Sequence, residues 1–218
     1  MGDWRGFRGL VVKTVAVTPS GALSPGPLSL SAIVAGATLG FIGGVYIAIG
    51  HTLFELPYVA VLWLGARWVR SYIERFERIL ATIAAIFIVY FAYLTAQVAL
   101  AGFDVSSEGI KIISPLHAIA VGIALTAFNP YFLLWWVSVG YPLVTEASRN
   151  GGRGLVIMYV SHVWMDYVWL ALLAATGGLV ARLGIAYKAL MALIAVMLVL
   201  FALDMIARSW AGRKIIPL

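Results

Sequence analysis

Six apolar runs of membrane-spanning length take up most of this 218-residue chain. A helix needs about 20 residues to cross a bilayer. The chain is 63% hydrophobic and only 11% charged, which is more apolar side chain than a soluble domain of this size can bury. We therefore expect an all-α, multi-pass integral membrane protein with one transmembrane domain over residues 1–218. The expected spans lie near residues 9–40, 43–66, 79–101, 114–144, 155–181 and 186–207.

The first and fourth runs are too long for a straight spanning helix, and each contains proline near its middle. Proline removes a backbone hydrogen bond and clashes with the preceding turn, so both runs are predicted to be broken helices. Beyond each break a half-helix is expected to start, with backbone N–H groups and a positive dipole end available to an anion. The two breaks are predicted at Ser24-Pro25-Gly26-Pro27 and at Asn129-Pro130, with Ser24 and Asn129 as the helix caps.

An internal repeat relates the two halves of the chain. When residues 50–70 are aligned with residues 161–181, His51 matches His162 and Glu55 matches Asp166. Repeat 1 then covers residues 9–101 and repeat 2 covers residues 114–210. Three spans in each half force the second half to enter the membrane upside down, which is the inverted-repeat architecture of secondary transporters.

The distribution of Lys and Arg predicts the orientation in the membrane. Twelve of the 15 basic residues lie in the N-terminal segment, a predicted loop at 67–78, the loop near 149–153 and the C-terminus. The positive-inside rule therefore predicts cytoplasmic N- and C-termini in the cell membrane. Because the basic residues are scattered between apolar runs, the net charge of +6 does not indicate a nucleic-acid partner.

Glu55 and Asp166 are the two acidic residues of nine that fall at mid-span. A buried charge costs about 2.5 to 3.5 kcal/mol on insertion scales, so such residues are functional candidates. His51 and His162 each precede an acid by four residues, which places imidazole and carboxylate on one helix face. We expect the inverted symmetry to bring these four proton-coupling candidates together at the midplane. The structural alternative is that each histidine only ties neighbouring helices together.

The predicted midplane offers N–H donors for a carboxylate and acids for an ammonium group, and an amino acid carries both. The sequence contains no cysteine, nucleophile triad, phosphate loop or nucleotide motif, so we expect no enzyme activity, no cofactor and no ATP-driven pumping. The candidate substrate-binding residues are Ser24, Pro25, Gly26, Pro27, Asn129, Pro130, Glu55 and Asp166.

At these motifs the sequence resembles the lysine exporter (LysE-type) family of amino-acid efflux proteins. The resemblance covers nearly the whole chain, and the segments 129–136 and 162–169 look most like its archaeal branch. It implies six spans in inverted repeats, export of amino acids from the cytoplasm, and proton antiport. Many members carry an acid directly after the glycine of the second span, whereas here His51 follows Gly50 and the acid comes a turn later at Glu55.

Three functions are compatible with these patterns. The first is an alternating-access exporter of amino acids, including cationic ones, that is driven by protons and needs no bound metal. The second is a divalent metal cation exporter in which His51, Glu55, His162 and Asp166 are the ligands. The third is an intramembrane metal-dependent enzyme or a non-transporting assembly factor. Assembly into a homo-oligomer is compatible with all three.

Overall fold

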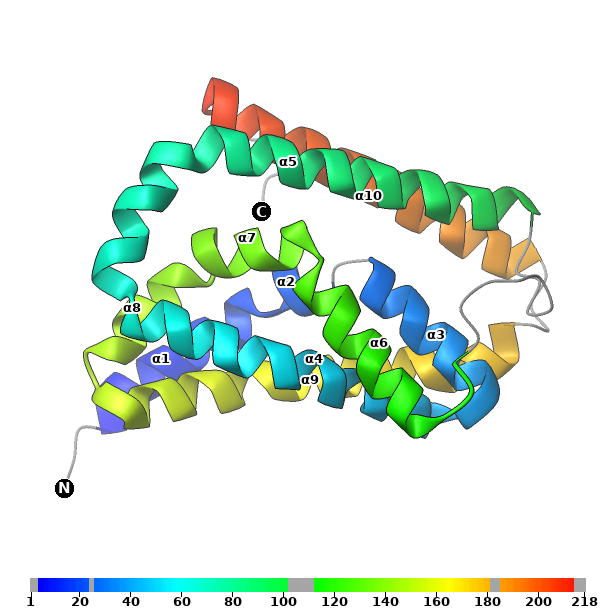
Figure 1. The fold of residues 1–218 in the computed structure, drawn as a ribbon, viewed down its shortest axis with the longest axis horizontal. Helices are drawn as coiled ribbons and strands as arrows, with labels where there is room; N and C mark the ends of the chain where they lie inside the picture. The colour runs from blue at the N-terminus through cyan, green and yellow to red at the C-terminus, as the bar shows by residue number, and fades with distance from the viewer. Residues whose placement is uncertain (1–3, 24–25, 102–111, 181–184, 214–218) are drawn as a thin grey trace.

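The computed structural model describes residues 4–23, 26–101, 112–180 and 185–213 of the chain (Figure 1). Within these residues the fold is all-α, as predicted, and contains no strand. The helices are α1 Trp4–Val17, α2 Pro19–Ala22, α3 Pro27–Leu39, α4 Phe41–Leu64, α5 Ala66–Ala101, α6 Pro115–Ala127, α7 Pro130–Ser138, α8 Tyr141–Ser148, α9 Gly151–Val180 and α10 Ile185–Ala211.

Among the described residues, two helices are long and apolar enough to cross a membrane, namely α4 and the segment Gly151–Thr176 of α9. Two further pairs of helices pass the same test together. Phe7–Ala22 meets Pro27–Leu39 at an angle of 75°, and Pro115–Ala127 meets Pro130–Ser138 at 59°. With two to four candidate spans in an all-helical fold, the chain is a multi-pass membrane protein.

Both predicted breaks are present, and each ends where a helix starts with proline. α7 begins at Pro130, and the side chain of Asn129 caps it. α3 begins at Pro27 after Gly26, whose backbone is extended and which offers no side chain to cap the helix. The predicted cap Ser24 and its neighbour Pro25 lie outside the described residues.

The prediction of a charged loop at residues 67–78 was wrong, because α5 runs without interruption from Ala66 to Ala101. The segment contains Arg and Glu but neither Gly nor Pro. Arg and Glu are good helix formers, so charge alone does not end a helix. The preceding helix ends instead at Gly65, the residue that separates α4 from α5.

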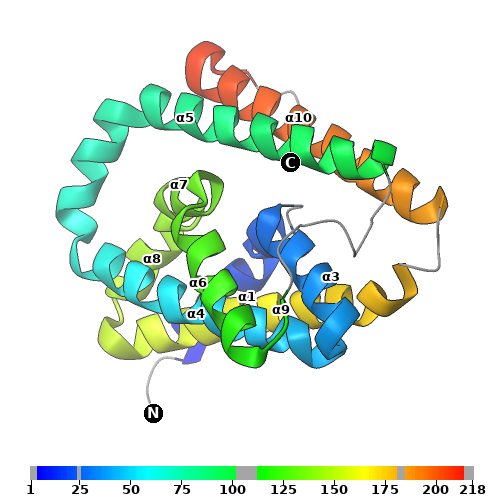
Figure 2. The ribbon, with the colours of Figure 1, turned by 45° about the vertical axis from the view of Figure 1, so that its right-hand side comes forward.

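α4 and α9 run along the long axis of the molecule and pack against each other (Figures 1 and 2). α6, which precedes the second break, packs on α4, whereas α3, which follows the first break, packs mainly on α9. One segment of each broken helix therefore contacts the long helix of the other half. α5 and α10 lie side by side as a separate layer, and α5 reaches the rest of the molecule mainly through α7.

Glycines allow the central helices to approach closely. A Cβ added to Gly50 on α4 would run into the carbonyl group of Ile119 on α6, and one added to Gly122 on α6 would run into the carbonyl of Ile47. Because these glycines have no side chain, the backbones of α4 and α6 can come into direct contact. Gly40 has a different use, since its φ of 66° makes the turn from α3 into α4.

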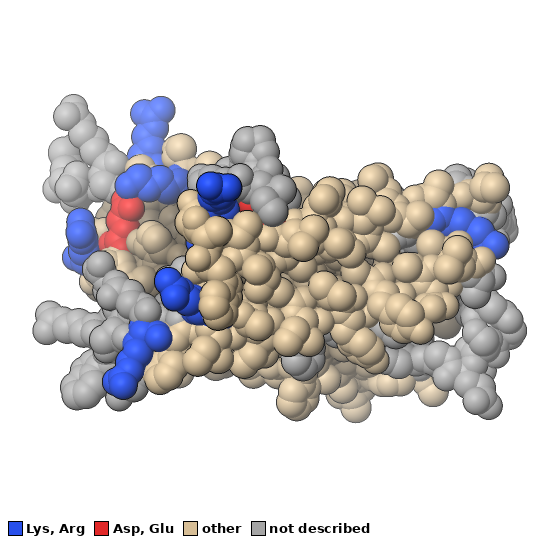
Figure 3. All heavy atoms as spheres, turned by 90° about the horizontal axis from the view of Figure 1, so that it is seen from above, with Lys and Arg blue, Asp and Glu red and all other residues tan. Residues whose placement is uncertain are grey.

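Two buried apolar clusters pack around the ends of α4 and α9. One includes Val59, Trp136 and Met158, and the other includes Ile47 and Leu170. Charged side chains on the face shown in Figure 3 lie toward the two ends of the long axis. At the end formed by α1 and α8, Lys13 pairs with Glu146 at 2.8 Å. The polar residues of α4 and α9 described below lie between these apolar clusters.

Candidate functional site

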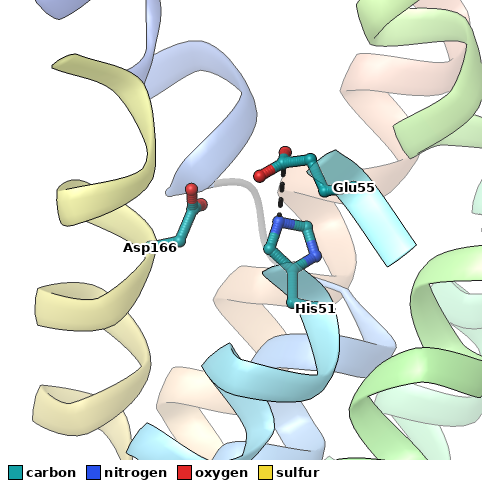
Figure 4. A group of neighbouring side chains, drawn as sticks. All are labelled: His51, Glu55 and Asp166. Atoms are coloured by element: carbon teal, nitrogen blue, oxygen red, sulfur yellow. Dashed lines mark ion pairs between the residues drawn. The ribbon is translucent and has the colours of Figure 1, made fainter. Parts of the chain in front are cut away.

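The two histidine–acid turns meet in one cluster, as the internal repeat predicted. His51 and Glu55 come from α4, and His162 and Asp166 come from α9. Their exposed fractions are 4%, 0%, 2% and 5%, respectively. Figure 4 shows that His51, Glu55 and Asp166 point toward one another across the space between the two helices.

Glu55 is surrounded by hydrogen-bond donors and histidine nitrogens. Its Oε1 accepts a hydrogen bond from Trp136 Nε1 at 2.9 Å, and its Oε2 accepts one from the Tyr159 hydroxyl at 3.0 Å. The Nε2 atoms of His51 and His162 lie 3.2 Å and 3.3 Å from the same Oε1. Both carboxylate oxygens of Glu55 are therefore engaged by side chains of the protein.

Asp166 has a different environment, although it is the counterpart of Glu55 in the repeat. Its Oδ2 lies 3.5 Å from His162 Nε2, within ion-pair range, but this atom has no hydrogen-bond partner among the described residues. Asp166 also lines a cavity that Glu55 does not line. A buried carboxylate oxygen without a donor is costly, so it is the atom of this cluster best suited to accept a ligand's N–H group.

The cavity has a volume of about 280 Å³. Its polar lining includes His51, His162 and Asp166, and the described part of the first break contributes Gly26 and Pro27. Asn129 also lines it, whereas Pro130 is not among the lining residues. From the outer layer α5 contributes Ile88, and α10 contributes Met197 and Leu198.

The two half-helix starts differ in what they can offer an anion. At α7, the Asn129 Oδ1 atom accepts hydrogen bonds from the N–H groups of Tyr131 and Phe132 at 3.1 Å and 3.3 Å. These two donors are occupied, contrary to the expectation that both half-helix starts have free donors. At α3 the capping position is Gly26, which cannot occupy the N–H groups of the first turn with a side chain.

Aromatic residues of α7 pack against the histidines and form hydrogen bonds with the segment before the first break. Trp135 stacks on the imidazole of His162 with ring centroids 5.4 Å apart, and Phe132 packs edge-on against His51 at 5.2 Å. The Tyr131 hydroxyl donates to the carbonyl of Ser20 at 2.8 Å, and Trp135 Nε1 donates to the Ser20 hydroxyl at 3.1 Å. The segment before the first break is thus tied to the helix that follows the second.

Sequence reasoning identified the four cluster residues but missed Tyr159 and the threonines that contact the histidines. Tyr159 precedes His162 by three residues and so shares its helix face, which is a signal that the sequence did contain. His51 Nδ1 lies 2.9 Å from Thr126 Oγ1, and His162 Nδ1 lies 2.9 Å from Thr18 Oγ1. Neither threonine carries a local signal, because each belongs to the opposite half of the chain.

The cluster also has the composition of a cation site. Ligand atoms of His51, Glu55 and Asp166 all lie within 4.8 Å of one another. Imidazole nitrogen and carboxylate oxygen are ligands that a zinc-like ion accepts. The arrangement can therefore bind a proton, an ammonium group or a divalent cation.

Comparison with known proteins assigns the family. A family model described as LysE type translocator matches residues 19–209. Searches of curated proteins and of solved structures each gave no match. Proteins of this family are transporters and not enzymes. The match covers most of the chain, including both breaks and the whole histidine–acid cluster, and the chain therefore belongs to the LysE type translocator family.

Proposed function

We propose that this protein exports amino acids, including cationic ones, from the cytoplasm in exchange for protons. The single observation that carries the proposal is the buried Oδ2 of Asp166, which accepts no hydrogen bond from any residue that the structure describes and belongs to a residue that lines the cavity. Asp166 is only 5% exposed, and a buried carboxylate oxygen that accepts no hydrogen bond is stabilised by a positively charged or N–H-bearing ligand. The ammonium group of an amino acid is such a partner.

The start of α3 supplies the complementary recognition element. Gly26 and Pro27 line the same cavity as Asp166, and the positive end of the α3 dipole faces the break. We assign the substrate carboxylate to this helix start, and we assign to Asn129-Pro130 the role of shaping α7. The cavity volume of about 280 Å³ lies at the small end of ligand pockets, which favours a single amino acid over a peptide.

Proton coupling is assigned to His51, His162 and Glu55, with Asp166 joining them when no substrate is bound. Three of these side chains meet at one oxygen atom, since both Nε2 atoms contact Oε1 of Glu55. His162 also lies within 3.5 Å of Asp166. A substrate ammonium group at Asp166 therefore competes with a proton held by the same cluster, which is the requirement for antiport.

We also propose that the helices form six spans in two inverted repeats, with both termini in the cytoplasm and the protein in the cell membrane. The packing supports this proposal, because the segments before the two breaks make equivalent contacts: α1 packs on α9 of the second half, and α6 packs on α4 of the first half. The two bent pairs occupy equivalent places in the two halves. The excess of Lys and Arg on the side of the termini supports the orientation.

Proteoliposomes containing the purified protein test the transport function. An imposed proton gradient is expected to drive accumulation of at least one amino acid from a labelled panel, and preloaded unlabelled substrate is expected to drive counterflow. Asp166→Asn is expected to lower both activities strongly at substrate concentrations near the wild-type KM. Glu146→Gln is the matched control, because Glu146 is an acid that pairs with Lys13 at one end of the molecule. If the wild-type protein moves no amino acid in either assay, the proposal is wrong.

Export of a divalent cation is the second candidate, and the grouping of ligand atoms within 4.8 Å favours it. His51, Glu55 and Asp166 would bind the ion, and His162 Nε2 lies close enough to both acids to join them. This function predicts stoichiometric metal in protein purified without added metal, and loss of that metal in His51→Ala. Counterflow of the metal ion without counterflow of any amino acid would decide in its favour.

A further inference from the structure

Each histidine of the cluster is hydrogen-bonded to a threonine from the opposite half of the chain. Thr18 Oγ1 lies 2.9 Å from Nδ1 of His162, and Thr126 Oγ1 lies 2.9 Å from Nδ1 of His51. Both threonines are buried, with exposed fractions of 0% and 1%. A threonine of the first half thus contacts a histidine of the second half, and a threonine of the second half contacts a histidine of the first in the same way.

The direction of these hydrogen bonds follows from counting hydroxyl protons. Thr18 donates its one hydroxyl proton to the carbonyl of Thr14 at 2.7 Å, and Thr126 donates its proton to the carbonyl of Gly122 at 2.6 Å. Each threonine oxygen can then only accept a hydrogen bond from the imidazole. The Nδ1 atom must carry the proton in both histidines.

This arrangement determines where the second imidazole nitrogen points. With Nδ1 donating to a threonine, Nε2 of His51 and Nε2 of His162 face the same oxygen of Glu55, at 3.2 Å and 3.3 Å. The threonines therefore aim both Nε2 atoms at one point, where a proton or a metal ion can be held between imidazole and carboxylate.

Both threonines lie close to a helix break. Thr18 lies between α1 and α2, on the N-terminal side of the first break. Thr126 lies in the last turn of α6, three residues before Asn129. A movement of the helix segment before either break would therefore shift a threonine relative to a histidine that belongs to the other half.

We propose that Thr18 and Thr126 are positioning residues that link the two broken helices to the cation held at Glu55, each by orienting the histidine of the opposite half. The proposal rests on the proposed function in one respect, namely that a cation at this cluster drives transport. It extends that function by naming the contacts through which a movement of the broken helices reaches the cluster.

Nitrogen NMR of the imidazoles tests the orientation directly. The chain has three histidines, so full-length protein labelled with ¹⁵N-histidine and carrying His117→Gln reports only on His51 and His162. We expect a protonated Nδ1 for both residues, whether or not Nε2 also carries a proton. Thr18→Val is expected to produce an unprotonated Nδ1 at His162, and Thr18→Ser is expected to preserve the wild-type signal.

The same comparison applies to Thr126 and His51. An unprotonated Nδ1 in the protein with intact threonines would overturn the proposal, and so would unchanged spectra in both valine variants. Valine has nearly the shape of threonine, and size-exclusion chromatography in detergent checks that each variant is folded. Because this measurement needs no substrate, it separates failure of the positioning role from failure of the proposed transport function.

A coupling measurement tests the link to transport. We expect Thr18→Val and Thr126→Val to lower gradient-driven accumulation of the substrate by about tenfold, which lies within the range of typical coupling free energies. Counterflow is expected to stay within about twofold of the wild-type rate. The serine variants are expected to restore accumulation. Thr145→Val is a matched control, since the Thr145 hydroxyl also donates to the carbonyl four residues earlier. Equal loss of accumulation and counterflow, or failure of serine to rescue, would show a structural role only.

Discussion

His162 contacts Glu55 across the two halves of the chain, with its Nε2 atom 3.3 Å from Oε1 of the carboxylate. His51 approaches the same oxygen from the carboxylate's own helix at 3.2 Å. Glu55 is therefore contacted by histidines from both halves of the chain. Its counterpart Asp166 lines the cavity, and its Oδ2 accepts no hydrogen bond from the part of the chain that the structure describes. The two acids were equivalent in the sequence repeat but are not equivalent in the structure.

Removing the charge of Asp166 is expected to weaken substrate binding. A hydrogen bond to a charged group contributes about 1.5 to 3 kcal/mol, which corresponds to about a tenfold to 150-fold increase in KM. Initial rates of counterflow in proteoliposomes at increasing substrate concentration measure the change in Asp166→Asn. An unchanged KM in a folded Asp166→Asn protein would show that Oδ2 does not bind the substrate.

Glu55→Gln is expected to abolish proton-driven accumulation of the substrate but to leave substrate exchange by counterflow intact. The amide has the size of the carboxylate but lacks the charge that both Nε2 atoms face. We expect gradient-driven accumulation to disappear while counterflow continues, because substrate exchange needs no net movement of protons. The two assays on one preparation make the comparison, and accumulation equal to wild type would contradict the role of Glu55.

A methyl group at Gly50 is expected to destabilise the contact between α4 and α6, because its Cβ would run into the carbonyl of Ile119. Overpacking of this kind costs about 1 to 3 kcal/mol. Thermal unfolding of Gly50→Ala in detergent micelles measures the loss. Gly9→Ala is the matched control, since Gly9 on α1 has open space at the Cβ position. Similar unfolding temperatures for both variants would contradict the close approach.

Asn129→Ala is expected to lower stability with little effect on substrate affinity. The variant loses the side chain that caps Tyr131 and Phe132, and loss of such a cap costs about 0.5 to 2 kcal/mol. Asn129→Ser retains an oxygen acceptor and is expected to keep most of the stability. A large rise in KM without a loss of stability would show instead that Asn129 binds the substrate.

The orientation can be tested by labelling single cysteines, because the chain contains no native cysteine. Ile113 and Asn150 are exposed and lie before and after the second broken helix. With cytoplasmic termini, a membrane-impermeant maleimide on intact cells is expected to label Ile113→Cys and to leave Asn150→Cys unlabelled. The reverse result would invert the proposed topology.

Several features of the fold were predictable from local sequence. Proline at positions 27 and 130 starts a half-helix in each case, because a residue without an N–H group is tolerated in the first turn. The spacing of four in His51 and Glu55 places both side chains on one face of α4. The continuous helix through residues 67–78 was missed because charge was read as the end of a helix, although helix-breaking residues are absent there.

The contacts between helices were decided by tertiary structure alone. Glu55 accepts hydrogen bonds from Trp136 and Tyr159 on two other helices, whereas Oδ2 of Asp166 accepts none among the described residues. The threonine that orients each histidine comes from the opposite half. Local sequence determined which side chains share a helix face, because helix geometry repeats every 3.6 residues. Which side chains contact one another across helices depended on how closely glycine-lined helices pack, and that distance is a property of the assembled fold.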